Sequence, residues 1–290
     1  MIPRSKRFEL LAVACVVGAL VLLYGDVFLA LVANWQSDEN YSHSFIVLPA
    51  IAYLVWLRRE RLAATEVRPS NVGLLLVVVG VGLLFVGTAG VEFFLMRTSA
   101  VAVIAGMVLS LAGWRWLRVL LFPISLLALI VPVPPVLFYQ AAFPLQLSAT
   151  KFGVAALELL RIPVLREGNV IQLAHTTLEV TEACSGIRSL ISLFALAVLY
   201  GYFADSRAVP RAVIALSSLP IAIVSNGLRI AGTGVAAHYI GPETATGFFH
   251  AFSGWVVFMT SFAMMIAVAH FVRIPTSRGS LAPRPELATS

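Results

Sequence analysis

Residues 72–90 read VGLLLVVVGVGLLFVGTAG, a stretch that contains no charged side chain. A helix that crosses the hydrocarbon core of a bilayer needs about 20 predominantly apolar residues. Seven further apolar runs fall near 8–33, 43–57, 98–114, 117–131, 187–204, 210–230 and 249–272. The chain is therefore predicted to be an all-α polytopic integral membrane protein with about eight transmembrane helices.

The composition agrees with this class. Of the 290 residues, 60% are hydrophobic and 12% are charged, and the mean hydropathy is +0.94. A soluble domain of this length cannot bury so much apolar surface. The first run lacks a small-residue cleavage site and is interpreted as a retained span. We expect one multispanning domain over residues 1–275 and a disordered cytoplasmic tail over 276–290.

The basic residues indicate the orientation in the membrane. With the N-terminus in the cytoplasm, 14 of the 20 basic residues fall on the cytoplasmic side, as the positive-inside rule requires. They are Arg4, Lys6, Arg7, Arg58, Arg59, Arg61, Arg68, Arg115, Arg118, Arg207, Arg211, Arg273, Arg278 and Arg284. The net charge of +6 thus reflects the basic residues of the cytoplasmic loops, and no nucleic-acid partner is expected. Both termini are predicted to be cytoplasmic.

This topology leaves residues 34–44, 132–183 and 231–248 outside. Within 132–183, the prolines of VPVPP break the chain, because proline lacks a donor and fixes φ. Residues 138–160 then predict an amphipathic helix at the membrane interface. NVIQL (169–173) and TLEV (177–180) predict a small periplasmic hairpin. For 231–248 we expect a surface-lying or partly inserted helix.

TEACSGIRSL (181–190) places Cys184 at the start of a long apolar helix. The positive end of a helix dipole favours a thiolate, which is the nucleophilic form of cysteine. The alternative is that Cys184 is a small apolar residue packed at a helix end. Cys15 lies inside the first span, so neither a disulfide framework nor a metal cluster is expected.

Two further motifs lie at the same predicted membrane face as Cys184. Arg229 in SNGLRIAG either serves function or snorkels to the interface. His250 in GFFHAFSGW is either an acid/base group or structural. A thiolate, a cation that binds it or an oxyanion, and an acid/base group together form a complete acyl-transfer set. The presence of all three groups at one predicted membrane face favours a catalytic role for them.

Four further residues are candidates for supporting roles at the same site. His43, Glu182, Arg188 and Asn226 are expected to orient the catalytic groups or to contact substrate. Arg188 is four residues after Cys184 and so lies on the same helical face, whereas Glu182 has the alternative role of capping the helix start. No cofactor and no metal ion are expected.

The blocks REGNVIQL, LEVTEACSGIRSL, SNGLRIAGTG and FFHAFSGW resemble the exosortase family, and the resemblance covers nearly all of residues 35–270. It implies a sortase-like cysteine protease/transpeptidase of the bacterial inner membrane, associated with exopolysaccharide production. Its substrates would be PEP-CTERM proteins, which carry a C-terminal Pro-Glu-Pro-type motif, a spanning helix and a basic cluster. The family's catalytic residues fall on Cys184, Arg229 and His250.

The resemblance implies attack by Cys184 on the sorting signal, an acyl-thioester, and transfer to an acceptor amine or to water. The substrates, the amine and the oligomeric state stay open. The identity of the proton donor also stays open. Because a guanidinium has a high pKa and is a poor acid, His250 is favoured over Arg229 for this role. Alternatives are a polytopic transporter, a thiol redox enzyme, and a non-catalytic scaffold for envelope or exopolysaccharide assembly.

Overall fold

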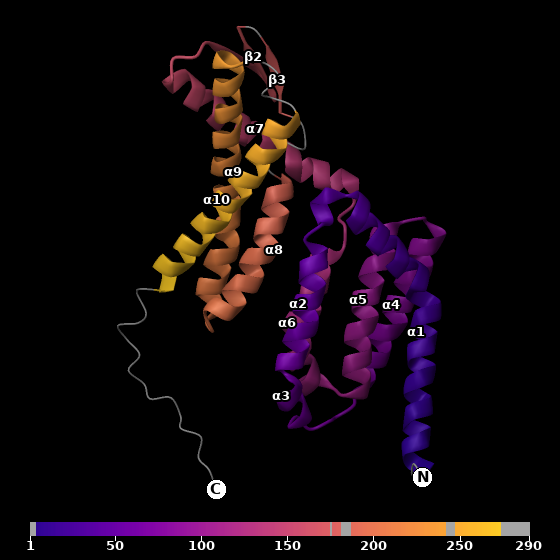
Figure 1. Cartoon of the computed structure of the whole chain (residues 1–290). Helices are drawn as coiled ribbons and strands as arrows, with labels where there is room; N and C mark the ends of the chain where they lie inside the picture. The colour runs from indigo at the N-terminus through magenta and orange to yellow at the C-terminus, as the bar shows by residue number, and fades with distance from the viewer. Residues whose placement is uncertain (1–3, 175, 181–186, 242–246, 274–290) are drawn as a thin grey trace. The chain divides into compact units, whose positions relative to one another are not determined.

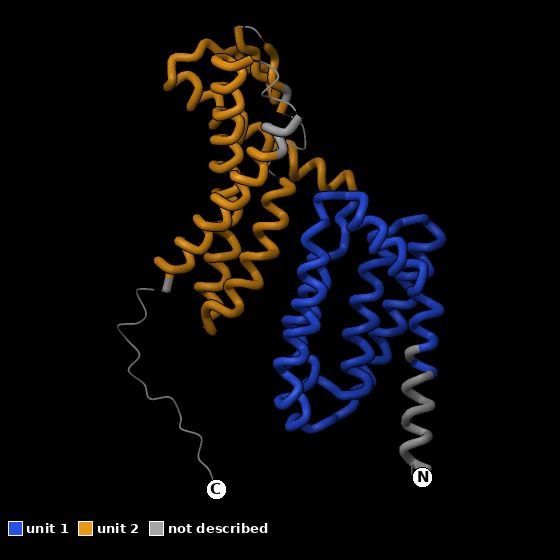
Figure 2. The backbone as a smooth tube through the Cα atoms, in the orientation of Figure 1, with its two compact units in different colours: residues 1–134 blue, residues 135–290 orange. Residues whose placement is uncertain are grey.

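The computed structural model describes residues 4–174, 176–180, 187–241 and 247–273, and most of these residues are helical (Figure 1). The chain divides into two compact units, residues 1–134 and 135–290 (Figure 2). The single domain predicted for residues 1–275 stays a prediction. The tail 276–290 lies outside the described residues.

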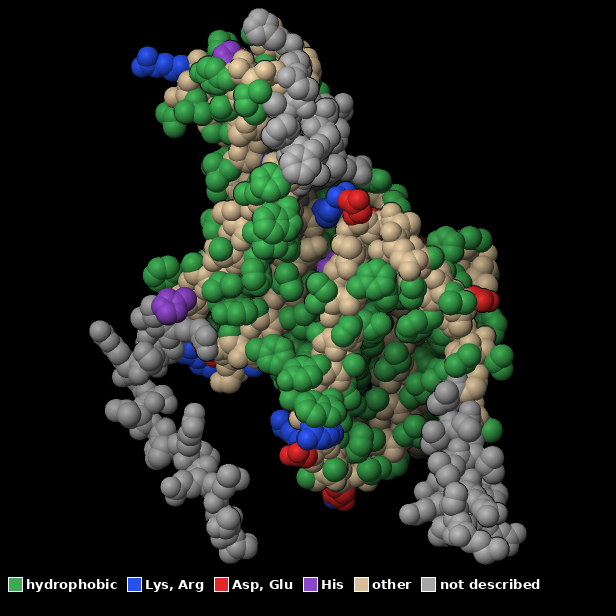
Figure 3. Space-filling view, in the orientation of Figure 1, with side chains coloured by type: hydrophobic (Ala, Val, Ile, Leu, Met, Phe, Trp, Pro, Cys, Tyr) green, Lys and Arg blue, Asp and Glu red, His purple; other side chains and the backbone are tan. Residues whose placement is uncertain are grey.

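Seven helices in the described ranges are long and apolar enough to cross a membrane. They are Gly18–Ser37, Glu39–Leu57, Asn71–Ala89, Phe93–Leu111, Ile187–Ala204, Ala208–Tyr239 and Phe252–Val272. Trp114–Ile130 and Pro135–Leu159 meet the same criteria only as a pair, which gives up to eight spans. On the visible face, hydrophobic side chains far outnumber charged ones (Figure 3). The predicted all-α polytopic membrane class is confirmed.

Unit 1 contains six α-helices and two short 3₁₀ helices in its described part. They are α1 (Arg4–Ser37), η1 (Glu39–Tyr41), α2 (Ser44–Leu57), α3 (Arg59–Ala63), α4 (Asn71–Ala89), α5 (Phe93–Leu111), α6 (Trp114–Leu126) and η2 (Leu127–Ile130). The predicted fifth span, 117–131, therefore corresponds to α6 followed by η2.

Helices α4 and α5 pack closely because glycines line their contact. A Cβ at Gly73 would lie 2.1 Å from the backbone nitrogen of Ser110, and one at Gly106 would lie 2.8 Å from the backbone nitrogen of Val77. Small residues let helix backbones approach, which is the main route to tight helix packing in lipid. The packing glycines of the opening apolar stretch are thus Gly73, Gly80 and Gly87. A Cβ at Gly82 would instead meet nothing within 4 Å.

Unit 2 begins where the predicted proline break ends. Its elements are α7 (Pro135–Leu159), β1 (Val164–Glu167), β2 (Val170–Leu173), β3 (Thr177–Glu179), α8 (Ile187–Ala204), α9 (Ala208–Tyr239) and α10 (Gly247–Arg273). Pro135 is the first residue of α7, a position where the missing N–H costs nothing. The helix predicted over 138–160 exists as α7, and its position at the membrane interface stays a prediction.

The expectation of a surface-lying or partly inserted helix over residues 231–248 was wrong for residues 231–239. Residues 231–239 do not form a separate surface helix but continue α9, which has 32 residues. The rise of 1.5 Å per residue gives about 48 Å, well beyond the hydrocarbon thickness of about 30 Å. The extension is held by packing, since Ala231 joins a buried cluster with Leu157 and Ile162, and Gly234 contacts Leu157.

The strands form one antiparallel sheet in the order β1-β2-β3. The predicted hairpin is confirmed as β2 and β3, with Val170 opposite Glu179. Strand β1 was not predicted, although it is as long as β2; its Val164 packs against buried residues of α7 and α9 that only the folded chain brings together. It reaches β2 through a two-residue turn in which Gly168 has φ +66°, as tight hairpin turns require. Buried Ile171 packs the sheet against Ala149, Val154 and Ile230.

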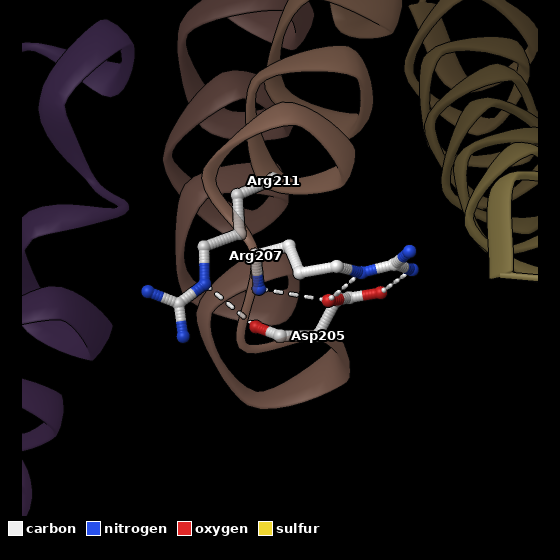
Figure 4. A network of polar contacts seen from close by, with 3 residues as sticks. All are labelled: Asp205, Arg207 and Arg211. Carbon is white, nitrogen blue, oxygen red and sulfur yellow. Dashed lines mark hydrogen bonds and ion pairs between the residues drawn. The ribbon is translucent and has the colours of Figure 1, made fainter. Parts of the chain in front are cut away.

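Helices α8, α9 and α10 run alongside one another (Figure 1) around a core that includes Leu193, Ile214 and Met265. A polar network closes the α8–α9 connection (Figure 4). The Asp205 carboxylate accepts from the backbone N, Nε and Nη2 of Arg207, at 2.8, 3.0 and 2.7 Å. Arg211 Nε donates to the Asp205 carbonyl oxygen at 2.6 Å, so both arginines fix the turn.

Candidate active site

The candidate site lies at the end of the α8–α9 pair that is opposite the Asp205 network. Helical rise puts Ile187 about 26 Å from Ala204 and Arg229 about 32 Å from Ala208. Because α8 and α9 are joined by a short connection and pack side by side, Ile187 and Arg229 are at the same end of unit 2. The separation of Arg229 from the turn equals about one hydrocarbon thickness.

Arg229 is half-buried between α9 and α10. Its Nε donates a hydrogen bond to the Oγ of Ser253, at 3.2 Å. A bond at Nε restrains the plane of the guanidinium, and a planar guanidinium can present paired donors to an oxyanion. The side chain is therefore tied to the neighbouring helix at this end of α9.

Gly254 supplies the space beside this arginine. A Cβ at Gly254 would lie 3.2 Å from Nη2, 3.5 Å from Cζ and 3.7 Å from Nη1 of Arg229. The first distance is tighter than most real Cβ contacts, so a side chain here would displace the guanidinium. Ser253 and Gly254 thus position Arg229 together.

Asn226 lies one turn before Arg229 on α9 and is 2% exposed. The next residue, Gly227, packs on α7, where a Cβ would lie 2.4 Å from Cδ1 of Phe152. Gly153 of α7 makes the reciprocal approach to Ile230. The α9 segment that carries Asn226 and Arg229 is therefore rigidly seated against α7.

Cys184 and Glu182 lie outside the described residues, but both flanks of their segment are well defined. Val180 is 2% exposed, and its carbonyl oxygen accepts from Gln146 Nε2 and Asn169 Nδ2, each at 3.2 Å. Its N–H donates to the Asn169 carbonyl at 2.9 Å. On the other side, Ile187 is 4% exposed. The chain therefore enters and leaves this segment at fixed points.

The remaining residues predicted in unit 2 sit at helix starts. Arg188 is the second residue of α8 and is half-buried. The backbone of His250 belongs to the first turn of α10, three residues before Ser253. Their catalytic roles stay predictions.

His43 belongs to unit 1 and is 5% exposed. Its Nδ1 lies 3.1 Å from the Asn40 carbonyl oxygen and its Nε2 lies 3.1 Å from the Leu129 carbonyl oxygen. These contacts tie the start of α2 to η2. A role of His43 toward substrate stays a prediction.

Within the described ranges, no three His, Cys, Asp or Glu side chains are grouped so that they could hold a metal ion. The chemistry offered by the described residues is that of a positioned guanidinium at a helix junction. This is the setting of charge stabilisation and anion binding.

Comparison with known proteins identifies the family. The model of the transmembrane exosortase family matches residues 35–267. The chain belongs to this family. The match spans both units and contains every candidate residue, from His43 to His250. No curated protein and no solved structure gives a significant match.

Four residues that position the candidate site were not predicted from the sequence. Ser253 and Gly254 stand in the histidine motif of this exosortase, three and four residues after His250. Gln146 and Asn169 bind the carbonyl of Val180 from positions 34 and 11 residues away. Only the pairing of distant segments distinguishes them from ordinary polar residues.

Proposed function

We propose that this exosortase is a membrane-embedded cysteine protease/transpeptidase that cleaves PEP-CTERM-type sorting signals of exported proteins. The signals are expected to carry a Pro-Glu-Pro-type motif, a spanning helix and a basic cluster. The proposed nucleophile is Cys184, and Arg229 and His250 assist it. Docking of the substrate helix among the enzyme's helices would supply proximity, which accounts for much of the rate in such reactions.

The observation that carries the proposal is the hydrogen bond from Arg229 Nε to Ser253 Oγ, at 3.2 Å. It joins the arginine motif on α9 to the histidine motif on α10. His250 is three residues before Ser253, and positions three apart on a helix lie on the same side. An arginine that only snorkelled would need no partner on a neighbouring helix.

Chain connectivity supports the participation of Cys184. Three peptide units separate it from Ile187, and three extended units span at most about 11 Å. Ile187 starts α8 at the same end of unit 2 as Arg229. This shared end of unit 2 supports the assignment of Cys184 and Arg229 to one site.

The proposed reaction has two steps. The Cys184 thiolate forms a bond to the carbonyl carbon at the motif, and the C–N bond then breaks. The leaving amine takes one proton, and the acyl group remains on sulfur as a thioester. An acceptor amine, or water, next attacks the thioester, loses a proton, and releases the thiolate.

Arg229 is assigned to the negative charge of the thiolate and the tetrahedral intermediate. Guanidinium stays protonated at any physiological pH, which makes it a good electrostatic partner and a poor proton donor. His250 is assigned to proton transfer, because imidazole titrates near neutral pH.

The proposed setting is the bacterial inner membrane, with both termini in the cytoplasm and the site at the periplasmic face. The arginines of the Asp205 network, Arg207 and Arg211, belong to the cytoplasmic set of the positive-inside argument. The site is at the other end of the same helices.

The test is to trap the acyl-enzyme. A periplasmic reporter protein with a C-terminal Pro-Glu-Pro-type motif, spanning helix and basic cluster is co-expressed with the enzyme. Mass spectrometry of the wild type is expected to find the reporter acyl group on Cys184. Cys184→Ala should accumulate normally and leave the reporter intact. Processing by Cys184→Ala would end the nucleophile assignment and favour a scaffold role.

A further inference from the structure

Strand β3 forms one edge of the sheet, and it leads directly into the cysteine block. Three residues form it, Thr177–Glu179, and the chain continues through Val180 toward residue 184. An edge strand presents backbone N–H and C=O groups that another extended chain can pair with. The hydrogen-bond pattern identifies which groups these are.

Residues in an antiparallel pair alternate between those that bond to the partner strand and those that face away. The Leu173 N–H donates to the Thr176 carbonyl, and the Val180 N–H donates to the Asn169 carbonyl. Both pairs lie in the β2–β3 register, so position 178 between them also bonds toward β2. The backbone groups of Thr177 and Glu179 therefore face the outer edge.

We infer that the outer edge of β3, at the backbone of Thr177 and Glu179, binds the substrate as an added antiparallel strand. The occupant is the extended segment of the polypeptide substrate beside the bond to be cleaved. This inference rests on the proposed function and specifies how its substrate is held. A peptide paired with β3 lies beside the strand that runs into the nucleophile segment, so pairing would set the register of the scissile carbonyl.

Two features suit this edge for the task. The exit of β3 is fixed, because the Val180 carbonyl is held by Gln146 and Asn169. In an added strand, the backbone N–H of every second residue points away from the edge and makes no hydrogen bond to it. Proline, which lacks this N–H, can therefore occupy these positions. A Pro-Glu-Pro order places its two prolines at such alternate positions while the middle residue bonds to the edge.

The binding test uses the reporter described above with one cysteine beside its motif. The enzyme carries Cys184→Ala and Cys15→Ser, so that cleavage and background thiols are removed. Thr177→Cys should form a disulfide with the reporter several-fold faster than Leu165→Cys on β1. Leu165 and Thr177 both lie opposite Gln172 and both are exposed, so the two positions differ in the edge that they occupy. Equal or reversed rates would overturn the inference.

The activity test uses proline, which removes the outward N–H at an edge where the fold tolerates it. Thr177→Pro should reduce reporter cleavage by about tenfold or more, as expected for loss of strand pairing. The backbone of Arg166 faces the outer edge of β1, so Arg166→Pro is the matched control and should cleave at the wild-type rate. Maleimide labelling of Cys184 in both variants checks that the nucleophile segment is intact.

The two proposals fail in different ways. Reporter cleavage by Cys184→Ala would defeat the proposed function. Cleavage that needs Cys184 but is unchanged in Thr177→Pro would defeat the strand-addition inference alone. If Thr177→Pro does not accumulate, the disulfide rates decide.

Discussion

Arg229 of α9 and Ser253 of α10 are 24 residues apart in the sequence and are joined by a 3.2 Å hydrogen bond from Nε to Oγ. Gly254, the next residue, leaves the guanidinium room that a Cβ at 3.2 Å would take away. A charged side chain within spanning helices is costly unless it is paired. The pairing indicates that this arginine is held in a defined orientation, and the first two predictions test whether that orientation matters.

Arg229→Lys should process the reporter on the order of 10²-fold more slowly than the wild type while accumulating normally. A lysine keeps the charge and still reaches an interface, but it loses the planar fork and the bond to Ser253. The magnitude is comparable to removal of one oxyanion donor. The measurement is a cleavage time course in membranes; wild-type rates in the lysine variant would reduce Arg229 to a membrane anchor.

Gly254→Ala should reduce processing by about tenfold with little change in stability. The new methyl group pushes the end of a flexible side chain, so the fold adapts while the guanidinium moves, and small displacements in a site cost rate. The control is Gly232→Ala on α9, where a Cβ meets nothing within 4 Å. Equal activities of the two variants would argue against positioning by Gly254.

Gly73→Ala should destabilise the protein by about 1–3 kcal/mol, the usual range for overpacking. Its Cβ would lie 2.1 Å from the backbone nitrogen of Ser110, and a backbone atom cannot swing aside. Gly82→Ala, in the same helix and with nothing within 4 Å, is the matched control. Thermal unfolding in detergent should separate the two variants, and matching unfolding temperatures would contradict the close α4–α5 contact.

The orientation predicts which positions an impermeant maleimide reaches from the periplasm. In a Cys15→Ser, Cys184→Ala background, Glu39→Cys and Gln172→Cys should label, because both positions are exposed and assigned to the periplasmic face. Arg207→Cys, also exposed, should label only after the membrane is permeabilised. Labelling of position 207 in intact cells would overturn the topology and the shared face of the site.

The sequence predicted much of the fold because lipid imposes a simple rule. A spanning segment must be apolar and must satisfy its own backbone, so runs such as 72–90 are helices wherever they pack. The β2–β3 hairpin also followed from a local pattern. Strand β1 and the extension of α9 through Tyr239 did not, because both are stabilised by packing between distant segments.

The sequence by itself determined the class of the protein, its family and the residues of the proposed chemistry, since these depend on hydropathy and on motifs read along one chain. Only the tertiary structure decided that Ser253 and Gly254 orient Arg229, that Gln146 and Asn169 hold the strand before Cys184, and which backbone groups of β3 face outward. Each of these depends on atoms from separate segments meeting within a few ångströms. Hydrogen bonds and steric contacts act over that range, and position along the chain does not specify it.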